Sequence, residues 1–246
     1  MIERIRRFGL GILGAVAILG AATQAQAQNA ALGERFEVSG IKAVRPTLVN
    51  TIAALQQGDA AKAKAAFEAY DSAWNGIEVY INVRSRDLYQ TLELNYQKKI
   101  EDALNKSSPD TKALLPEAQA MLAKYDEAID LVAKARPLNP LFDDIARLRI
   151  VRAHLREVTP ALKAGDLAKA RKSFDEFDNT WDSIEDLIKA RSSDAYVAIE
   201  KGMVQIEQAL MPQMPDVAQV TALVNDVTAQ YNAVLAEITR DARSRN

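Results

Sequence analysis

Apolar residues recur at helical spacing along most of the chain. Stripes at spacings of three, four and seven predict helices over roughly residues 38–55, 63–81, 88–104 and 115–132. The same order of stripes returns over residues 145–162, 170–188, 199–210 and 220–238. Glycine and proline are few and lie between the stripes. The pattern predicts an all-α chain with short turns between its helices.

A long internal repeat organises these helices. Residues 44–93 and 151–200 are related by an offset of 107, and 21 of the 50 aligned positions are identical. Pro137 and Pro140 interrupt the helical pattern between the two halves. We therefore expect a tandem repeat of two four-helix up-down bundles. Residues 37–134 are called the first copy below, residues 145–242 the second copy, and residues 135–144 the predicted linker.

The turns are equally regular. A Gly-Asp pair ends the first helix of each copy and caps the second, at Gly58-Asp59 and at Gly165-Asp166. Between the third and fourth helices of the second copy, residues 211–215 are expected to form a loop one residue shorter than its counterpart. The offset then falls to 106, which aligns Tyr125 with Tyr231.

The first 27 residues have the pattern of a signal peptide. A basic start is followed by an apolar run over residues 8–22 and by Ala25-Gln26-Ala27, a small-x-small cleavage site. An uncleaved anchor is the alternative, but the run is shorter than the roughly 20 residues that span a bilayer. We expect cleavage after Ala27, a periplasmic or secreted protein, and no membrane insertion afterwards.

Composition excludes several classes of function. The chain has no cysteine, so disulfides, thiolate metal sites and cysteine nucleophiles are absent. The formal net charge of −2 becomes −4 once the predicted signal is removed. A mildly acidic chain with mixed charges is a poor candidate for nucleic-acid binding or for docking on anionic lipid.

Polar residues that recur in both copies are the candidates for a site. Asp71 and Glu78 lie seven residues apart on one side of a predicted helix. Glu93 lies on the next helix, and the tight turn between the two helices is expected to bring it opposite Glu78. Facing carboxylates bind iron and other hard divalent or trivalent cations. The predicted metal ligands are Asp71, Glu78, Glu93, Asp178, Glu185 and Glu200.

A structural interpretation of the same residues stays open. Arg45, Arg84 and their counterparts also recur, and carboxylates near a bundle seam commonly pair with arginine or with a tyrosine hydroxyl. The repeated tryptophans and phenylalanines lie at core spacing. His154 is the only histidine and Thr47 stands at its repeat position, so we expect no histidine-based metal, haem or catalytic site. No nucleophile motif is present, and an enzyme is not expected.

The repeated run Ala-Leu-x-x-Gly-Asp-x-Ala-x-Ala, followed by Trp-x-x-Ile-Glu and Arg-Ser-x-Asp-x-Tyr, resembles an extracytoplasmic helical domain. That domain accompanies bacterial high-affinity iron permeases. The resemblance covers about 50 residues of each copy and implies a link to iron uptake. It would place acidic functional residues at Glu78, Glu93, Glu185 and Glu200. The permease's membrane helices and its Arg-Glu-x-x-Glu motif are missing, so only a role beside a permease follows.

Two functions remain for this chain. The first is an exported, non-enzymatic helical binding protein for metal, acting as an accessory of iron uptake beside a membrane permease. The alternative is a structural or adaptor module that binds another envelope or membrane protein through an exposed apolar face.

Overall fold

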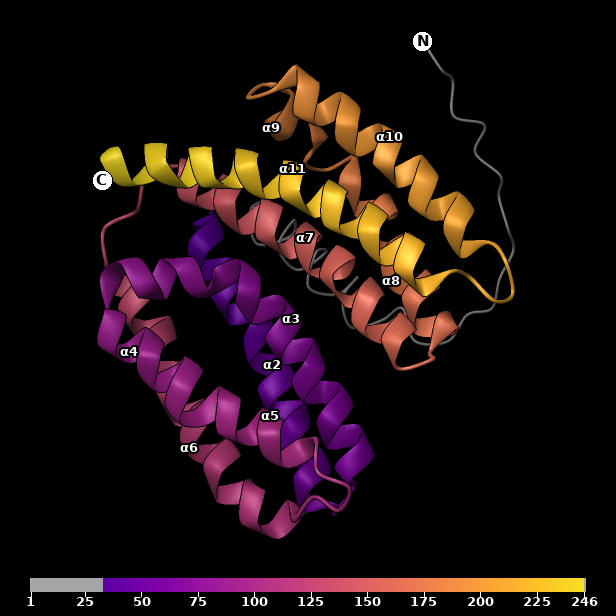
Figure 1. Cartoon of the computed structure of the whole chain (residues 1–246). Coiled ribbons are helices and arrows are strands. Elements are labelled where there is room, and N and C mark those ends of the chain that lie inside the picture. The colour runs from indigo at the N-terminus through magenta and orange to yellow at the C-terminus, as the bar shows by residue number, and fades with distance from the viewer. Residues whose placement is uncertain (1–32, 246) are drawn as a thin grey trace.

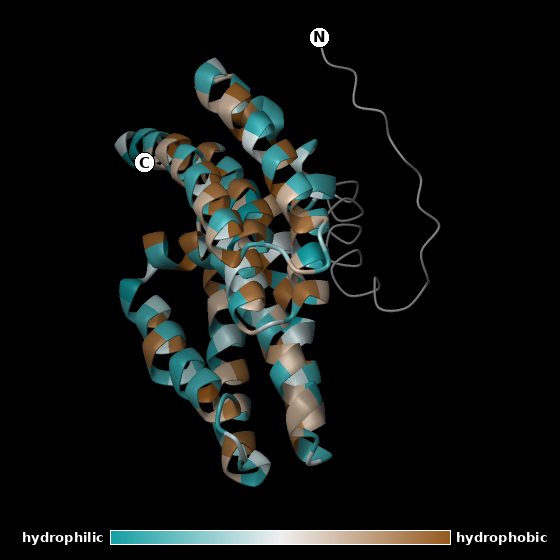
Figure 2. Cartoon of the chain, turned by 45° about the vertical axis from the view of Figure 1, so that its right-hand side comes forward, coloured by the Kyte–Doolittle hydropathy of each residue, from teal (hydrophilic) through white to brown (hydrophobic). Residues whose placement is uncertain are grey.

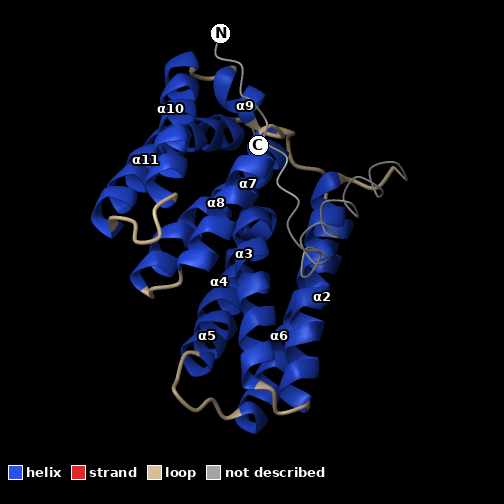
Figure 3. Ribbon diagram, turned by 90° about the vertical axis from the view of Figure 1, so that its right-hand side faces the viewer, coloured by secondary structure: helices blue, strands red, loops and turns tan. Residues whose placement is uncertain are grey.

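A computed structural model describes residues 33–245 of the chain, and regular structure in this range is entirely helical. No strand occurs among these residues, as Figure 3 shows. Hydrophilic and hydrophobic residues both occur along the helices, as the teal and brown segments of Figure 2 show. None of the described helices is long and apolar enough to cross a membrane. The predicted signal peptide, residues 1–27, lies outside the described residues.

The first copy contains two long helices, an interrupted third helix and a long fourth helix. Their bounds are α2 (Phe36–Gln56), α3 (Ala60–Arg84), α4 (Arg86–Gln90), the π-helix η1 (Thr91–Gln97), α5 (Lys98–Leu104) and α6 (Thr111–Lys134). Helix α2 packs against both α3 and α6 (Figure 1).

The second copy repeats this order. Its bounds are α7 (Leu141–Lys163), α8 (Leu167–Trp181), α9 (Glu185–Lys189), α10 (Ser193–Leu210) and α11 (Val217–Ser244). Helix α7 packs against α8 and α11, and α10 packs against α11 (Figure 1). Residues 135–140 connect α6 to α7, so the connection is shorter than the predicted linker.

The turns form as the sequence predicts. Gly58 has φ +73° and Gly165 has φ +77°, the left-handed conformation that glycine adopts without strain. The carboxylates that follow accept hydrogen bonds from backbone N–H groups, Asp59 from Lys62 and Asp166 from Lys169, at 2.9 Å each. Each Gly-Asp pair therefore ends one helix and begins the next.

Equivalent tyrosines join the first and fourth helices of each copy. The hydroxyl of Tyr125 donates to the carbonyl of Ile41 at 2.7 Å, and that of Tyr231 donates to the carbonyl of Leu148 at 2.6 Å. Both rings are fully buried. The bonds confirm that the two copies share one packing register, with an offset of 107 in the first helix and 106 in the last.

The change in offset occurs inside a helix, so the predicted shorter loop is wrong. The loops that end at the capping residues Asp110 and Asp216 have equal lengths. In the first copy, η1 begins before Glu93 and ends before the buried Ile100. A π-turn holds one residue more than an α-turn. The extra residue of the first copy is therefore absorbed by η1, and the predicted uninterrupted third helix is not present.

The second helix also differs between the copies. Helix α3 runs without a break to Arg84, whereas its counterpart ends at Trp181 and resumes as α9 at Glu185. The prediction of a continuous helix to Ile188 is therefore wrong. Ile184 is nevertheless buried, so the break keeps its side chain in the core.

The two copies pack on each other through α3 and α7. A Cβ on Gly76 would lie 2.3 Å from the side chain of Ile150, so any other residue there would force that side chain to shift. The hydroxyl of Tyr80 donates to Asp143 across this contact at 2.8 Å. The apolar residues of both copies form one continuous buried cluster.

A buried ion pair fixes the start of the first copy. Arg84 contacts Glu37 at 2.6 Å, and both side chains are almost fully buried, with 6% and 5% exposed. Arg84 also donates to the carbonyl of Arg136, and Arg35 donates to the carbonyls of Val132 and Ala135 at the end of α6. These bonds satisfy carbonyls that a helix end leaves without a partner.

Candidate ligand-binding cleft between the two copies

Glu93 and Glu200 each accept a hydrogen bond from a buried tryptophan. The indole N–H of Trp74 donates to Glu93 at 2.6 Å, and that of Trp181 donates to Glu200 at 2.5 Å. Both indoles are at most 1% exposed. A buried indole N–H needs an acceptor, so these bonds account for the recurrence of both glutamates. The expected partners were arginine or tyrosine, and tryptophan was not considered.

Glu78 forms an ion pair with an arginine of the second copy. Its carboxylate contacts Arg149 of α7 at 2.8 Å, and both side chains are about one-fifth exposed, at 18% and 21%. Burial raises the pKa of Glu78, Arg149 opposes that shift, and Glu93 adds to it. Burial and then the carboxylates of Glu78 and Glu93 raise the pKa of Tyr89 to about 12. Glu93 therefore acts on Glu78 from the neighbouring helix, and Arg149 opposes its effect.

Asp71 lies in a different environment. Its carboxylate accepts a hydrogen bond from Gln97 at 2.5 Å. Burial raises the pKa of Asp71 to about 6, with further increases from Glu101, Glu93 and Glu157 that exceed the opposing effect of Arg156. The offset of 106 makes Met203 the counterpart of Gln97, so this bond belongs to the first copy alone. Asp71 is therefore a half-buried carboxylate among other carboxylates.

The counterparts in the second copy are arranged differently. Asp178 lies on α8 and contributes, after burial, to the raised pKa of Asp175. Glu185 begins α9, where the helix dipole favours a negative charge. The break between α8 and α9 thus changes the path of the chain between these two carboxylates. Within residues 33–245, no group of three or more His, Asp or Glu side chains is arranged to hold a metal ion.

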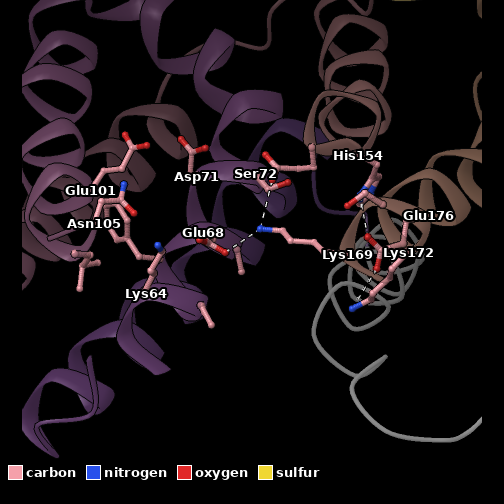
Figure 4. Close-up of a pocket in the computed structure, with 16 residues that line it drawn as sticks. Lys64, Glu68, Asp71, Ser72, Glu101, Asn105, His154, Lys169, Lys172 and Glu176 are labelled. Carbon is pink, nitrogen blue, oxygen red and sulfur yellow. Dashed lines mark hydrogen bonds and ion pairs between the residues drawn. The ribbon is translucent and has the colours of Figure 1, made fainter. Parts of the chain in front are cut away.

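A cleft lies where α3 and α5 of the first copy face α7 and α8 of the second. It has a volume of 360 Å³ and is rich in charged side chains. Figure 4 shows Asp71 and Glu101 on one wall and His154, Lys172 and Glu176 on the other. Asp71 is the one predicted metal ligand that lines this cleft. The remaining charged residues that line it are Lys64, Glu68, Glu157 and Lys169.

Ion pairs already neutralise the wall of the second copy. Lys169 lies 3.3 Å from Glu68 and 3.7 Å from Glu157, which links the two copies across the cleft. His154, which is buried, lies 3.3 Å from Glu176, as the dashed lines in Figure 4 mark. This hydrogen bond is the main reason that the pKa of Glu176 is lowered.

Sequence reasoning missed most of this cleft because it considered each copy alone. Apart from Lys169, whose counterpart is Lys62, the charged residues and the histidine of the second wall are not repeated: Thr47 stands at the position of His154, and Ala69 at that of Glu176. Departures from the repeat, rather than its identities, mark this wall. These differences between the copies were visible in the sequence. A polar residue that occurs in one copy only indicates a role that the other copy does not share.

Comparison with known proteins does not assign the chain to a family. No protein-family model matches the chain, and neither the curated proteins nor the solved structures searched give a significant match. The resemblance to the helical domain beside iron permeases therefore stays a prediction.

Proposed function

We propose that the chain is an exported, non-enzymatic helical binding protein that holds a small organic cation between its two copies. In this proposal each copy is a four-helix up-down bundle, and the contact of α3 with α7 sets the shape of the cleft. The observation that carries the proposal is Asp71, a half-buried carboxylate at a boundary between repeated units. Ligand sites favour such boundaries, and carboxylates with raised pKa values are common in them.

The charges of the cleft favour a positive ligand. The amine of Lys169 is neutralised by Glu68 and Glu157. Burial is the main cause of the raised pKa of Asp71, and the carboxylates of Glu101, Glu93 and Glu157 each raise it by more than Arg156 lowers it. A cation beside Asp71 and Glu101 would relieve that repulsion and would replace solvent at a partly buried charge.

An organic cation suits the side chains better than a metal ion. Calcium takes six to eight oxygen ligands, and magnesium takes six, some of them waters. The described residues offer no group of three or more candidate ligands. An ammonium group has three donors and needs only a few acceptors, which Asp71, Glu101 and Asn105 supply on one wall.

Titration calorimetry with putrescine tests the proposal. We expect one site per chain, at least tenfold weaker in Asp71→Asn and unchanged in Asp178→Asn, the repeat counterpart. Affinity should also fall about tenfold from pH 7.5 to pH 5, because a carboxylate with a pKa of about 6 is mostly protonated at pH 5. No putrescine binding would overturn the proposal. The metal hypothesis predicts instead that Fe³⁺ binds twice and that Glu93→Gln and Glu200→Gln each remove one site.

An adaptor function has one observation of its own. Val197, Val204 and Met211 follow each other at intervals of seven at the outer face and end of α10, and are 59%, 41% and 66% exposed. This spacing suits a partner helix from another envelope or membrane protein. A photo-crosslinker at position 204 should then capture one defined protein in cells that produce the chain. The same group at the exposed Leu94 of the first copy should not, and equal capture at both positions would contradict the adaptor.

A further inference from the structure

A second groove, whose lining contains no acidic residue, lies between α7 and α11. These helices run side by side in Figure 1. The groove has a volume of 480 Å³, and its charged lining consists of arginine: Arg149, Arg152, Arg240 and Arg243. Its other lining residues are neutral, namely Asn232, Leu235, Ala236 and Thr239. Such an accumulation of like charge is costly unless something neutralises it.

The repeat supplies an internal reference for this groove. At the equivalent face of the first copy, each basic residue has an acidic partner. Arg45 binds Asp126 through two bonds, of 2.6 and 2.9 Å. Lys134 contacts Asp130 at 2.8 Å. Lys42 contacts Glu34, which lies just before α2. This face of the first copy is therefore neutral.

The second copy keeps the basic residues and has lost their partners. Arg149, Arg152 and Arg240 stand at the positions of Lys42, Arg45 and Lys134. The three acids have become neutral residues: Glu34 corresponds to Leu141, Asp126 to Asn232 and Asp130 to Ala236. Arg243 adds a further charge where the first copy has Pro137. Glu78, which reaches Arg149 from α3, offsets one of the four positive charges.

Arg152 contacts the residue equivalent to the partner of Arg45, but that residue is neutral. Arg152 donates to the amide oxygen of Asn232 at 2.5 Å, where Arg45 has a carboxylate. In the described part of the chain, the Nε atoms of Arg149 and Arg152 are buried without a hydrogen-bond partner. Burial, then Arg156 and Arg149, lowers the pKa of Arg152. The guanidinium of Arg152 thus faces like charges and lacks an ionic partner.

We infer that the groove between α7 and α11 binds a small multivalent oxyanion, a phosphate ester or a polycarboxylate. The planar guanidinium group binds both kinds of oxyanion through paired hydrogen bonds. An anion there would take the place of the carboxylates that the second copy has lost. The volume of the groove exceeds that of a bare phosphate ion, so it leaves room for the body of a small organic molecule. This site is separate from the proposed cation cleft and opposite to it in charge.

Calorimetry at fixed ionic strength tests this inference with inorganic phosphate and with citrate. We expect one of the two anions to bind at one site per chain. Binding should weaken at least tenfold in Arg152→Gln with Arg240→Gln. The matched control, Lys42→Gln with Lys134→Gln, changes the equivalent positions of the first copy and should leave the affinity unchanged. The inference is overturned if neither anion binds or if both double variants lose binding equally.

Asn232→Asp gives a sharper test because it restores the carboxylate of the first copy. It should weaken anion binding at least tenfold and raise the melting temperature, since Arg152 regains an ionic partner. Unchanged affinity in this variant would contradict the inference. Cosedimentation with phosphatidylglycerol vesicles distinguishes a lipid surface from a free anion. Vesicle binding without binding of either free anion would also overturn it.

Discussion

The two copies share the main hydrogen bonds of their cores but differ in the charged residues around those cores. Both retain the bond from a buried indole to a glutamate and the bond from a buried tyrosine to the first helix. They differ at polar positions on their outer faces and in the paths of their second and third helices. Duplication thus preserved what the core requires, whereas positions that contact solvent or the other copy diverged. Diverged positions line both the cleft between the copies and the groove between α7 and α11, the two places for which we propose ligands.

Deleting one residue from the third helix should give the largest difference in stability between the two copies. Deleting Gly202 in the second copy turns the rest of α10 by about 100°, so that Ile206 and Leu210 leave the core. We expect a loss of more than about 4 kcal/mol in the free energy of unfolding. Deleting Asn95 in the first copy converts η1 into α-helix and should cost less than about 1 kcal/mol. Urea unfolding measures both, and equal losses would contradict the assignment of the extra residue to η1.

The next contrast concerns equivalent arginines. Arg84→Ala removes one of the two arginines that contact the buried carboxylate of Glu37, the other being Arg35 at 2.7 Å, and should cost about 2–3 kcal/mol. Arg191→Ala removes a more exposed pair with Asp241, whose side chains are 24% and 34% exposed, and should destabilise the chain much less, because solvent screens exposed ion pairs. Thermal unfolding of the two variants compares them. Similar costs would mean that the Arg84 pair is effectively solvated.

The indole bonds should behave alike in both copies. Trp74→Phe keeps most of the ring volume but removes the donor to Glu93, and Trp181→Phe does the same for Glu200. Each change should cost about 1–2 kcal/mol, as expected for losing a hydrogen bond to a partly buried charge. Urea unfolding of each single variant gives the values. A cost confined to one copy would show that the repeated bonds are not equivalent.

The smallest expected effect depends on pH. Because the pKa of Asp71 is raised to about 6, the folded chain keeps this proton to a higher pH than the unfolded chain. Its stabilising contribution is complete below the unfolded pKa, about 3.9, and is lost as the pH rises through 6. In Asp71→Asn the side chain does not titrate, so the variant does not lose this stability as the pH rises. Allowing for solvent screening, the variant should gain roughly 1 kcal/mol over the wild type at pH 8 and nothing at pH 3.5.

Much of the fold follows from the sequence because its causes are local. The Gly-Asp turns, the capping aspartates and the heptad stripes each act within one or two turns of helix. The repeat also singled out Trp74, Glu93 and Asp71, three residues whose side-chain hydrogen bonds lie inside the first copy. Local patterns missed the π-helix η1, although the equal lengths of the loops before Asp110 and Asp216 were visible in the sequence.

The cleft and the arginine groove depend on contacts between distant parts of the chain. The approach of α3 to α7 depends on Gly76, whose counterpart is Ser183, so the repeat gives no sign of it. Glu78 was predicted as a metal ligand, and its partner Arg149 lies 71 residues away in the other copy. No spacing rule within a single copy predicts such a pair. The divergence between copies carries this information, and it becomes readable once the register of both copies is known.

The number of organic cations bound per chain tests the central claim most directly. A site between the copies exists once, whereas a site built from the repeated carboxylates exists twice. We expect calorimetry with putrescine to give one site per chain, at least tenfold weaker in Asp71→Asn and retained when Glu93 and Glu200 are both changed to glutamine. Two equal sites per chain, lost in the double glutamine variant and retained in Asp71→Asn, would contradict the account.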